Sequence, residues 1–158
     1  MLVSSKQLIR TICKIIVFNA VLLSVFGILQ KIYYVPSDNL LEIWGIWDTP
    51  EPRYYFASFT YKNHWSAFAL IIISILIGLL QNAFQKKGLH GLHTKTNLFL
   101  MTGLIPICTS IPLSGSRSGS LLLILLLIGS LILMIRHYKF SKAKPLLLSI
   151  LGISIFIL

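Results

Sequence analysis

The sequence predicts an all-α integral membrane protein, a polytopic helical bundle, and both its composition and its apolar runs lead to this fold class. Hydrophobic residues make up 56% of the 158 positions and charged residues only 11%, with a mean hydropathy of +0.84. An ordinary soluble domain is about 25% charged. Apolar runs of about 20 residues, the length that crosses a bilayer, recur along the chain. We therefore expect a single membrane domain over residues 1–158.

Five apolar runs are the expected transmembrane helices, and residues 30–65 are the expected outer loop between the first two. The second run has no charged residue, and the fourth is mostly Leu and Ile. At about 1.5 Å per residue, the last run covers only about two thirds of a bilayer core about 30 Å thick, so we expect a truncated last helix and a partial chain. The expected spans are 12–29, 66–84, 97–113, 118–135 and 146–158.

The first apolar run has a second interpretation, a cleavable signal peptide, because a basic segment precedes it. Its end, Gly27-Ile-Leu-Gln30, contains no small-x-small cleavage site. We therefore expect this segment to be retained as a helix.

Basic residues gather on one side of the expected membrane. Ten of the fourteen Lys and Arg residues lie there: Lys6, Arg10, Lys14, Lys86, Lys87, Lys95, Arg136, Lys139, Lys142 and Lys144. By the positive-inside rule this side is cytoplasmic. All the acidic residues fall in the 30–65 loop, which is then outside: Asp38, Glu42, Asp48 and Glu51. The net charge of +10 therefore reflects topology and anionic lipid headgroups, and it does not indicate a nucleic-acid partner.

The turn between the third and fourth helices, Ser114–Ser118, is the first candidate site. It lies on the outer side, where the positive-inside rule disfavours Arg117. Gly115 in the turn and Gly119 just after it permit close backbone approach, Ser114 and Ser116 offer hydroxyl donors, and Arg117 offers a two-pronged donor for phosphate oxygens. A diphosphate at the membrane surface fits this set, whereas a P-loop does not, because the Gly-Lys-Ser/Thr ending is absent. The alternative is an arginine that snorkels to lipid phosphate.

A second candidate segment, residues 54–68, runs from the outer loop into the second helix. Its aromatic residues are expected at a membrane interface, where rings favour the headgroup region. Lys62, Asn63 and His64 lie close in depth to Arg117, so they can bind a sugar hydroxyl or a diphosphate. Alternatively, Asn63 and His64 only cap and anchor the second helix.

The two segments together resemble motifs of the O-antigen ligase and polymerase family. Residues 56–68, Phe-Ala-Ser-Phe-Thr-Tyr-Lys-Asn-His-Trp-Ser-Ala-Phe, resemble its F-x-N-x-N-H-x-A type segment. Residues 113–119, Leu-Ser-Gly-Ser-Arg-Ser-Gly, resemble its Ser-x-Ser-Arg segment, and Gly27-Ile-Leu-Gln30 is a weaker match. The order, spacing and shared outer side of these motifs support the resemblance, which covers the middle part of a longer family member.

The resemblance implies a metal-independent glycosyltransferase of the bacterial inner membrane that needs no cofactor and acts in lipopolysaccharide or other polysaccharide biosynthesis. The donor is a polyprenyl-diphosphate-linked glycan, and the acceptor is lipid A core in ligases or the growing glycan in polymerases. By position, Arg117 binds the donor diphosphate and stabilises the leaving group, whereas Asn63 and His64 shape the donor site. The family's acceptor-activating histidine belongs to a later outer loop, so this chain by itself is expected to be inactive.

Other candidate residues are weaker. His64 is a possible substitute base, but its position matches the donor-site segment. His90 and His93 resemble a metal pair, yet no third ligand is near them in the sequence, so we expect no metal site. Cys13 and Cys108 lie in different helices, toward opposite sides of the membrane, and indicate neither a disulfide nor a zinc site.

Two classes of function follow from these residues. One is the glycosyltransferase, with ligation and polymerisation equally compatible with the motifs. The other is a non-catalytic transporter-like or lipid-binding membrane protein in which Arg117 holds a phosphate headgroup.

Overall fold

The structure, a computed structural model, describes residues 5–33, 42–43, 47–48, 55–87, 90 and 93–137, and long helices dominate this part of the chain. Between the first two helices, two short strands form an antiparallel ladder that pairs Glu42 with Asp48 and Ile43 with Trp47. The helical fold class is confirmed. The elements are α1 (Ser5–Ile32), β1 (Glu42–Ile43), β2 (Trp47–Asp48), α2 (Lys62–Lys87), α4 (Lys95–Leu113) and α5 (Arg117–His137).

The first four expected spans correspond to α1, α2, α4 and α5, but helices extend beyond the apolar runs. Helix α1 begins at Ser5 and α2 begins at Lys62, so Asn63 and His64 lie in the first turn of a helix and not in a loop. The expected loop 30–65 is correspondingly shorter and contains the β1–β2 ladder, which the sequence analysis did not predict. The fifth expected helix, 146–158, lies outside the described residues.

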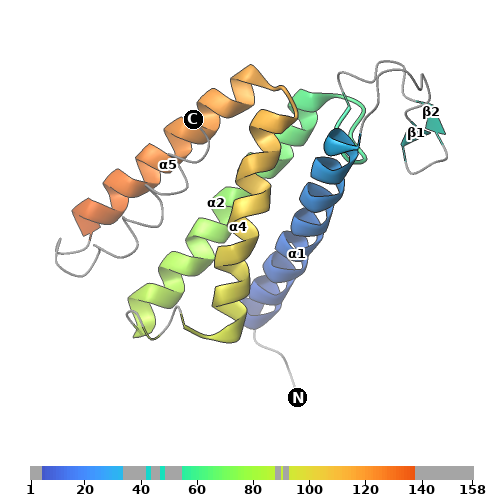
Figure 1. The fold of residues 1–158 in the computed structure, drawn as a ribbon. Helices are drawn as coiled ribbons and strands as arrows, with labels where there is room; N and C mark the ends of the chain where they lie inside the picture. The colour runs from blue at the N-terminus through green and yellow to red at the C-terminus, as the bar shows by residue number, and fades with distance from the viewer. Residues whose placement is uncertain are drawn as a thin grey trace.

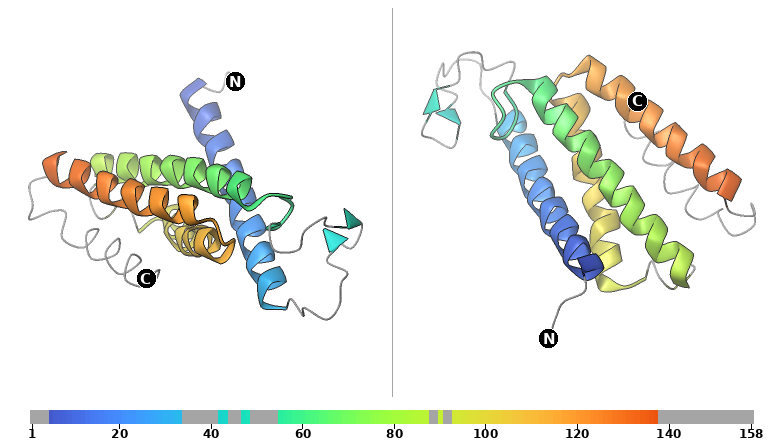
Figure 2. Two further views of the ribbon diagram at one scale, coloured as in Figure 1. Left: turned by 90° about the horizontal axis from the view of Figure 1, so that it is seen from above. Right: turned by 180° about the vertical axis from the view of Figure 1, so that it is seen from behind.

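The helices run alternately up and down, with α2 and α4 as the central pair (Figure 1). Helix α1 packs against α2 and α4 on one side, and α5 packs against the same two helices on the other, as Figure 2 shows from above and from behind. Within the described residues α1 and α5 do not contact each other. The start of α1, the end of α2 and the start of α4 therefore meet at one end of the bundle. The end of α1 and the starts of α2 and α5 meet at the other.

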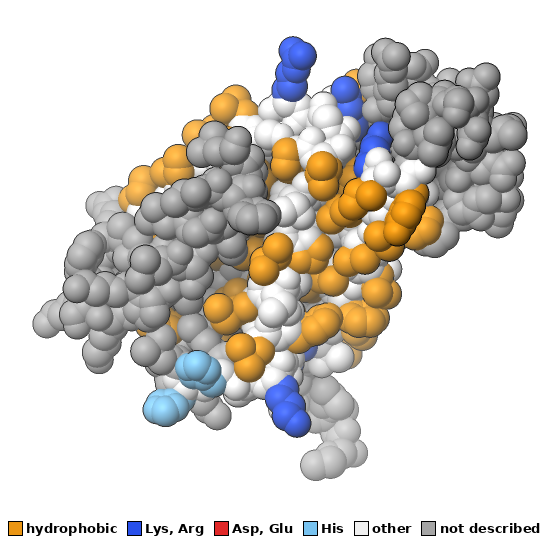
Figure 3. Space-filling view, in the orientation of Figure 1, with side chains coloured by type: hydrophobic (Ala, Val, Ile, Leu, Met, Phe, Trp, Pro, Cys, Tyr) orange, Lys and Arg blue, Asp and Glu red, His pale blue; other side chains and the backbone are white. Residues whose placement is uncertain are grey.

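The outer faces of the helices are apolar. Three helices, α1, α2 and α4, are long and apolar enough to cross a membrane, and α5 is apolar over Arg117–Leu133. Large hydrophobic side chains remain exposed along α1 and α5, and extended apolar faces of this kind are typical of surfaces that contact lipid or another protein. In Figure 3 such side chains cover the middle of the visible face, with Lys and Arg toward its ends. The exposed residues include Ile9, Ile15, Phe18, Leu22, Leu121, Leu125, Ile132 and Leu133.

Small residues allow the helices to approach one another closely. A Cβ atom on Gly103 of α4 would lie 2.8 Å from Val21 of α1, which is closer than such atoms approach. A Cβ atom on Gly119 of α5 would collide in the same way with Ser66 of α2. Tight crossings at Gly and Ser are typical of helices that pack without a strong hydrophobic drive. The crossing at Gly119 positions the candidate site.

Candidate functional site

The two candidate segments meet where α2 and α5 begin. The hydroxyl of Ser116 donates a hydrogen bond to Oδ1 of Asn63 at 2.8 Å, across 53 residues of sequence. We call this contact and its surroundings the α2–α5 junction, made of residues 62–66 and 114–119. The structure therefore brings together the two motifs that the sequence analysis treated as parts of one site.

Ser116 caps helix α5. Its Oγ accepts the N–H of Gly119 at 3.2 Å, and its carbonyl accepts the N–H of Ser120 at 3.0 Å. In a helix with this cap, the N–H groups of the next two residues, Arg117 and Ser118, have no preceding carbonyl within helical reach. Such groups form the positive end of the helix dipole and attract anions.

Gly115 separates α4 from α5. Its φ of +76° lies in the left-handed region, which glycine adopts without the steric penalty of a side chain. A Cβ atom at this position would lie 4.0 Å from both Cδ and Nζ of Lys62. The half-buried Lys62 side chain thus passes beside the turn and brings its ammonium group to the junction.

The hydroxyls of Ser114 and Ser116 are used inside the protein. Both residues are buried, with 1% of each exposed. Ser114 donates to the carbonyl of Ile111 at 2.6 Å, and its Oγ lies 3.5 Å from Oγ of Ser66. Ser116 donates to Asn63, as described above. In this arrangement the two serines hold the helix ends together, and they do not offer open hydroxyls to a ligand.

The remaining predicted residues differ in where they face. Arg117 is exposed and is the first residue of α5, next to the buried Ser116. Asn63 is half-buried and faces α5 through its bond to Ser116. His64 is exposed, and its ring lies edge-on to Tyr61 with centroids 5.5 Å apart. Adjacent helical residues point about 100° apart, so His64 cannot share the direction of Asn63.

An aromatic cluster supports the junction from within, because several of the aromatic residues expected at a membrane interface are buried in the protein. Tyr55, Phe56 and Trp65 are at most 1% exposed. Phe56 and Phe59 exchange two backbone hydrogen bonds of 2.9 Å, and both rings pack against Trp65, at 4.9 and 5.4 Å between centroids. The indole N–H of Trp65 donates to Oγ of Ser110 at 3.1 Å, which joins α2 to α4. These rings therefore form the end of the core.

The sequence contained a signal for this burial. Trp65 begins a stripe at helical spacing, which continues through Ala69, Ile72, Ile73 and Leu76, all buried. A period of about 3.6 residues identifies the core face of a helix. The sequence analysis assigned these aromatic residues to a membrane interface, and it therefore did not use their helical spacing.

Lys31 is a further basic residue at this end, which sequence reasoning missed. It belongs to the last turn of α1, and its ammonium lies 5.1 Å from the centre of the Tyr55 ring. A cation over an aromatic face is stabilised by the ring quadrupole. Lys31 and Lys62 are close enough for their positive charges to interact.

The weakly matching Gly27–Gln30 segment also lies at this end. A side chain at Gly27 would overlap the ring of Phe56, so this glycine admits the aromatic cluster against α1. Oε1 of Gln30 is buried and has no hydrogen-bond partner within the described part of the chain. Buried acceptor atoms in proteins normally accept a hydrogen bond.

No metal cluster is found at this site. Among the described residues, no three His, Cys, Asp or Glu side chains lie together. His90 and His93 are exposed, and Cys13 and Cys108 are free thiols on α1 and α4. The chemistry that the junction offers is therefore that of cations, an amide and helix N–H groups.

Comparison with known proteins identifies no relative. No protein-family model, curated protein or solved structure matches this chain significantly. The resemblance to the O-antigen ligase family rests on the motif residues alone.

Proposed function

We propose that the protein is a multi-pass protein of the bacterial cytoplasmic membrane, with the α2–α5 junction on the outer side. The exposed apolar side chains of α1 and α5 support this placement, because lipid is the solvent that accommodates them. The charge distribution supports the orientation. Arg10, Lys14 and Lys86 lie at the end opposite the junction, which the positive-inside rule makes cytoplasmic.

Cysteine labelling tests this orientation. In a background with Cys13 and Cys108 replaced by serine, we expect Asp48→Cys to react with a membrane-impermeant maleimide in intact cells. Lys87→Cys should react only after permeabilisation, because it lies at the other end of α2. The readout is a gel shift of the labelled protein. Labelling of Lys87→Cys in intact cells would reverse the proposed orientation.

We further propose that the α2–α5 junction binds the diphosphate of a polyprenyl-diphosphate-linked glycan, as in O-antigen ligase-like transfer to lipid A core or to a growing glycan. The observation that carries this proposal is the bond between Ser116 and Asn63, because it joins both motifs in one place. A diphosphate is bound by several hydrogen-bond donors that lie close together. The planar guanidinium of arginine can donate to two phosphate oxygens at once.

The residues at the junction divide into two roles in this proposal. Arg117, Lys62 and the first N–H groups of α5 neutralise the diphosphate, and in transfer they stabilise the charge that develops on the leaving group. The Asn63 carboxamide, oriented through its oxygen by Ser116, can direct its N–H groups toward a phosphate or a sugar hydroxyl. Ser114 and Ser116 position these groups from within the bundle.

Substitution of Arg117 tests the diphosphate role. We expect Arg117→Gln to weaken binding of undecaprenyl diphosphate about tenfold or more, and Arg117→Lys to weaken it less, because lysine keeps the charge but loses the fork. Binding to the purified protein in nanodiscs can be followed by native mass spectrometry. Because this chain by itself is expected to be inactive, glycan transfer is measured in a complete transferase that contains it, where Arg117→Lys should also lower transfer.

Lys95→Gln is the matched control, since it removes one exposed positive charge at the opposite end of the bundle. Its affinity for undecaprenyl diphosphate should stay within about twofold of the parent protein. Unchanged affinity and transfer in a folded Arg117→Gln protein would refute the diphosphate role. Binding that depends on Arg117, together with transfer by the complete transferase that does not depend on Arg117, would instead support the non-catalytic, lipid-phosphate-binding alternative.

A further inference from the structure

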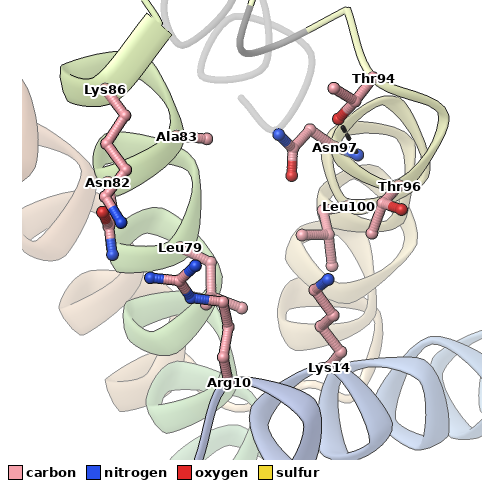
Figure 4. A pocket seen from close by; sticks show the side chains of 10 residues that line it. All are labelled: Arg10, Lys14, Leu79, Asn82, Ala83, Lys86, Thr94, Thr96, Asn97 and Leu100. Carbon is pink, nitrogen blue, oxygen red and sulfur yellow. Dashed lines mark hydrogen bonds between the residues drawn. The ribbon is translucent and has the colours of Figure 1, made fainter. Parts of the chain in front are cut away.

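A cavity lies at the end of the bundle opposite the α2–α5 junction, between α1, α2 and α4. Its volume is about 290 Å³, close to the lower limit of about 300 Å³ for small-molecule sites. Figure 4 shows α1 along one side of this space, with side chains of α2 and α4 facing each other across it. The residues that line it are Arg10, Lys14, Leu79, Asn82, Ala83, Lys86, Thr94, Thr96, Asn97 and Leu100.

The charges of this cavity are of one sign. Arg10 and Lys14 enter from α1 and Lys86 from α2, and none of the described residues that line the space is acidic. Like charges around one space repel each other, and an anion placed among them removes that repulsion. The sequence analysis assigned the basic charge to topology and to anionic lipid headgroups in general, and it did not predict that these three residues line one cavity.

The neutral polar groups at this cavity also suit an anion. Thr94 caps α4 by accepting the N–H of Asn97 at 3.3 Å, so the positive end of the α4 dipole borders the space. Asn82 of α2 and Thr96 of α4 are also among the lining residues, and they carry an amide and a hydroxyl group. A phosphate group, with its several acceptor oxygens, matches cations and neutral donors drawn from three helices.

Apolar surface adjoins the charged lining. Leu79, Ala83 and Leu100 line the cavity, and Leu100 is buried. Outside it, Ile9 is 61% exposed beside Arg10, and Leu98 is 46% exposed beside Asn97. A ligand with a phosphate and an attached hydrocarbon chain would contact both kinds of surface, whereas free phosphate would use only the charged part. Basic pockets between membrane helices bind anionic headgroups for this reason.

We propose that this cavity binds the phosphate headgroup of an anionic phospholipid, with the acyl chains along the apolar faces of α1 and α4. This inference rests on the proposed membrane placement, but it is independent of the glycan-binding site at the other end.

The test uses the purified full chain in a neutral detergent, titrated with phosphatidylglycerol and with phosphatidylcholine of the same acyl chains. Native mass spectrometry counts the bound lipids. We expect phosphatidylglycerol to bind in preference to phosphatidylcholine, and Arg10→Gln, Lys14→Gln and Lys86→Gln each to weaken it about fivefold. Lys95→Gln is the matched control. It removes a charge between the lining residues Thr94 and Thr96 but does not line the cavity, so its affinity should be unchanged.

The outcomes separate the possible sources of binding. Equal weakening by Lys95→Gln would show general surface attraction and overturn the proposal. Saturable binding of inorganic phosphate that displaces the lipid would assign the site to a free anion and would also overturn it. Circular dichroism confirms that each variant keeps its helices. Arg117→Gln should leave phosphatidylglycerol binding intact, so failure of the glycan proposal is distinguishable from failure of this one.

Discussion

Replacement of Trp65 by alanine is expected to lower the free energy of unfolding by about 3–5 kcal/mol. The side chain is fully buried and packs against three phenylalanine rings, Phe56, Phe59 and Phe68. Its loss would leave a cavity at the point where α1, α2 and α4 meet, and it would leave Oγ of Ser110 without the indole donor. Unfolding in mild detergent titrated with sodium dodecyl sulfate, followed by circular dichroism, measures this change.

Trp65→Phe separates ring packing from hydrogen bonding. It keeps an aromatic ring against the cluster and loses the N–H that reaches Ser110, so we expect a smaller loss of about 1–2 kcal/mol. Ala67→Gly is a useful comparison on the exposed face of α2, where a change costs about 1 kcal/mol through helix propensity. A Trp65→Ala protein as stable as the parent would show that the aromatic cluster does not hold the helices together.

Replacement of Gly119 by valine is expected to destabilise the bundle by about 1–3 kcal/mol and to abolish diphosphate binding as well. The new Cβ atom would collide with Cβ and Oγ of Ser66. Because the Ser66 Cβ atom is attached directly to the α2 backbone, the collision can be relieved only by moving α5 away from α2. That movement would break the bond between Ser116 and Asn63. Thermal unfolding and lipid binding should therefore fail together.

Gly129→Val is the matched control in the same helix. A Cβ atom at Gly129 meets nothing within 4 Å, so the valine would project into open space. We expect stability within about 1 kcal/mol of the parent protein and normal diphosphate binding. Equal effects of valine at positions 119 and 129 would mean that the close crossing at Ser66 does not shape the site.

Much of the helical fold follows from the sequence, because apolar run length decides where a helix can cross lipid. The runs 12–29, 66–84, 97–113 and 118–135 each lie within a helix of the structure. The ends of the helices were harder to predict. Segments 5–11 and 62–65, which mix polar and apolar residues, continue α1 and α2 by further turns, and hydropathy carries no information about where such turns stop.

The candidate site was predictable in its location but not in its detail. Chain order alone placed Lys62, Asn63 and Arg117 at one end of the bundle. Which side chains face each other depends on the rotation of each helix about its axis, and that rotation is set by packing at Gly119 and Trp65. For the same reason, neither the burial of Ser114 and Ser116 nor the shared cavity of Lys14 and Lys86 could be predicted from the sequence.

The length of α2 has a consequence for the membranes that would suit this protein. Between Lys62 and Lys86 the helix contains no Lys, Arg, Asp or Glu. At about 1.5 Å per residue, these lysines stand about 36 Å apart, somewhat more than a hydrocarbon core of about 30 Å. A modest tilt of α2 would place both ammonium groups in the headgroup region, whereas a thicker bilayer would bring them toward the hydrocarbon core. Hydrophobic mismatch, acting on this one helix, would thus determine the depth at which the two ends of the bundle meet the membrane surface.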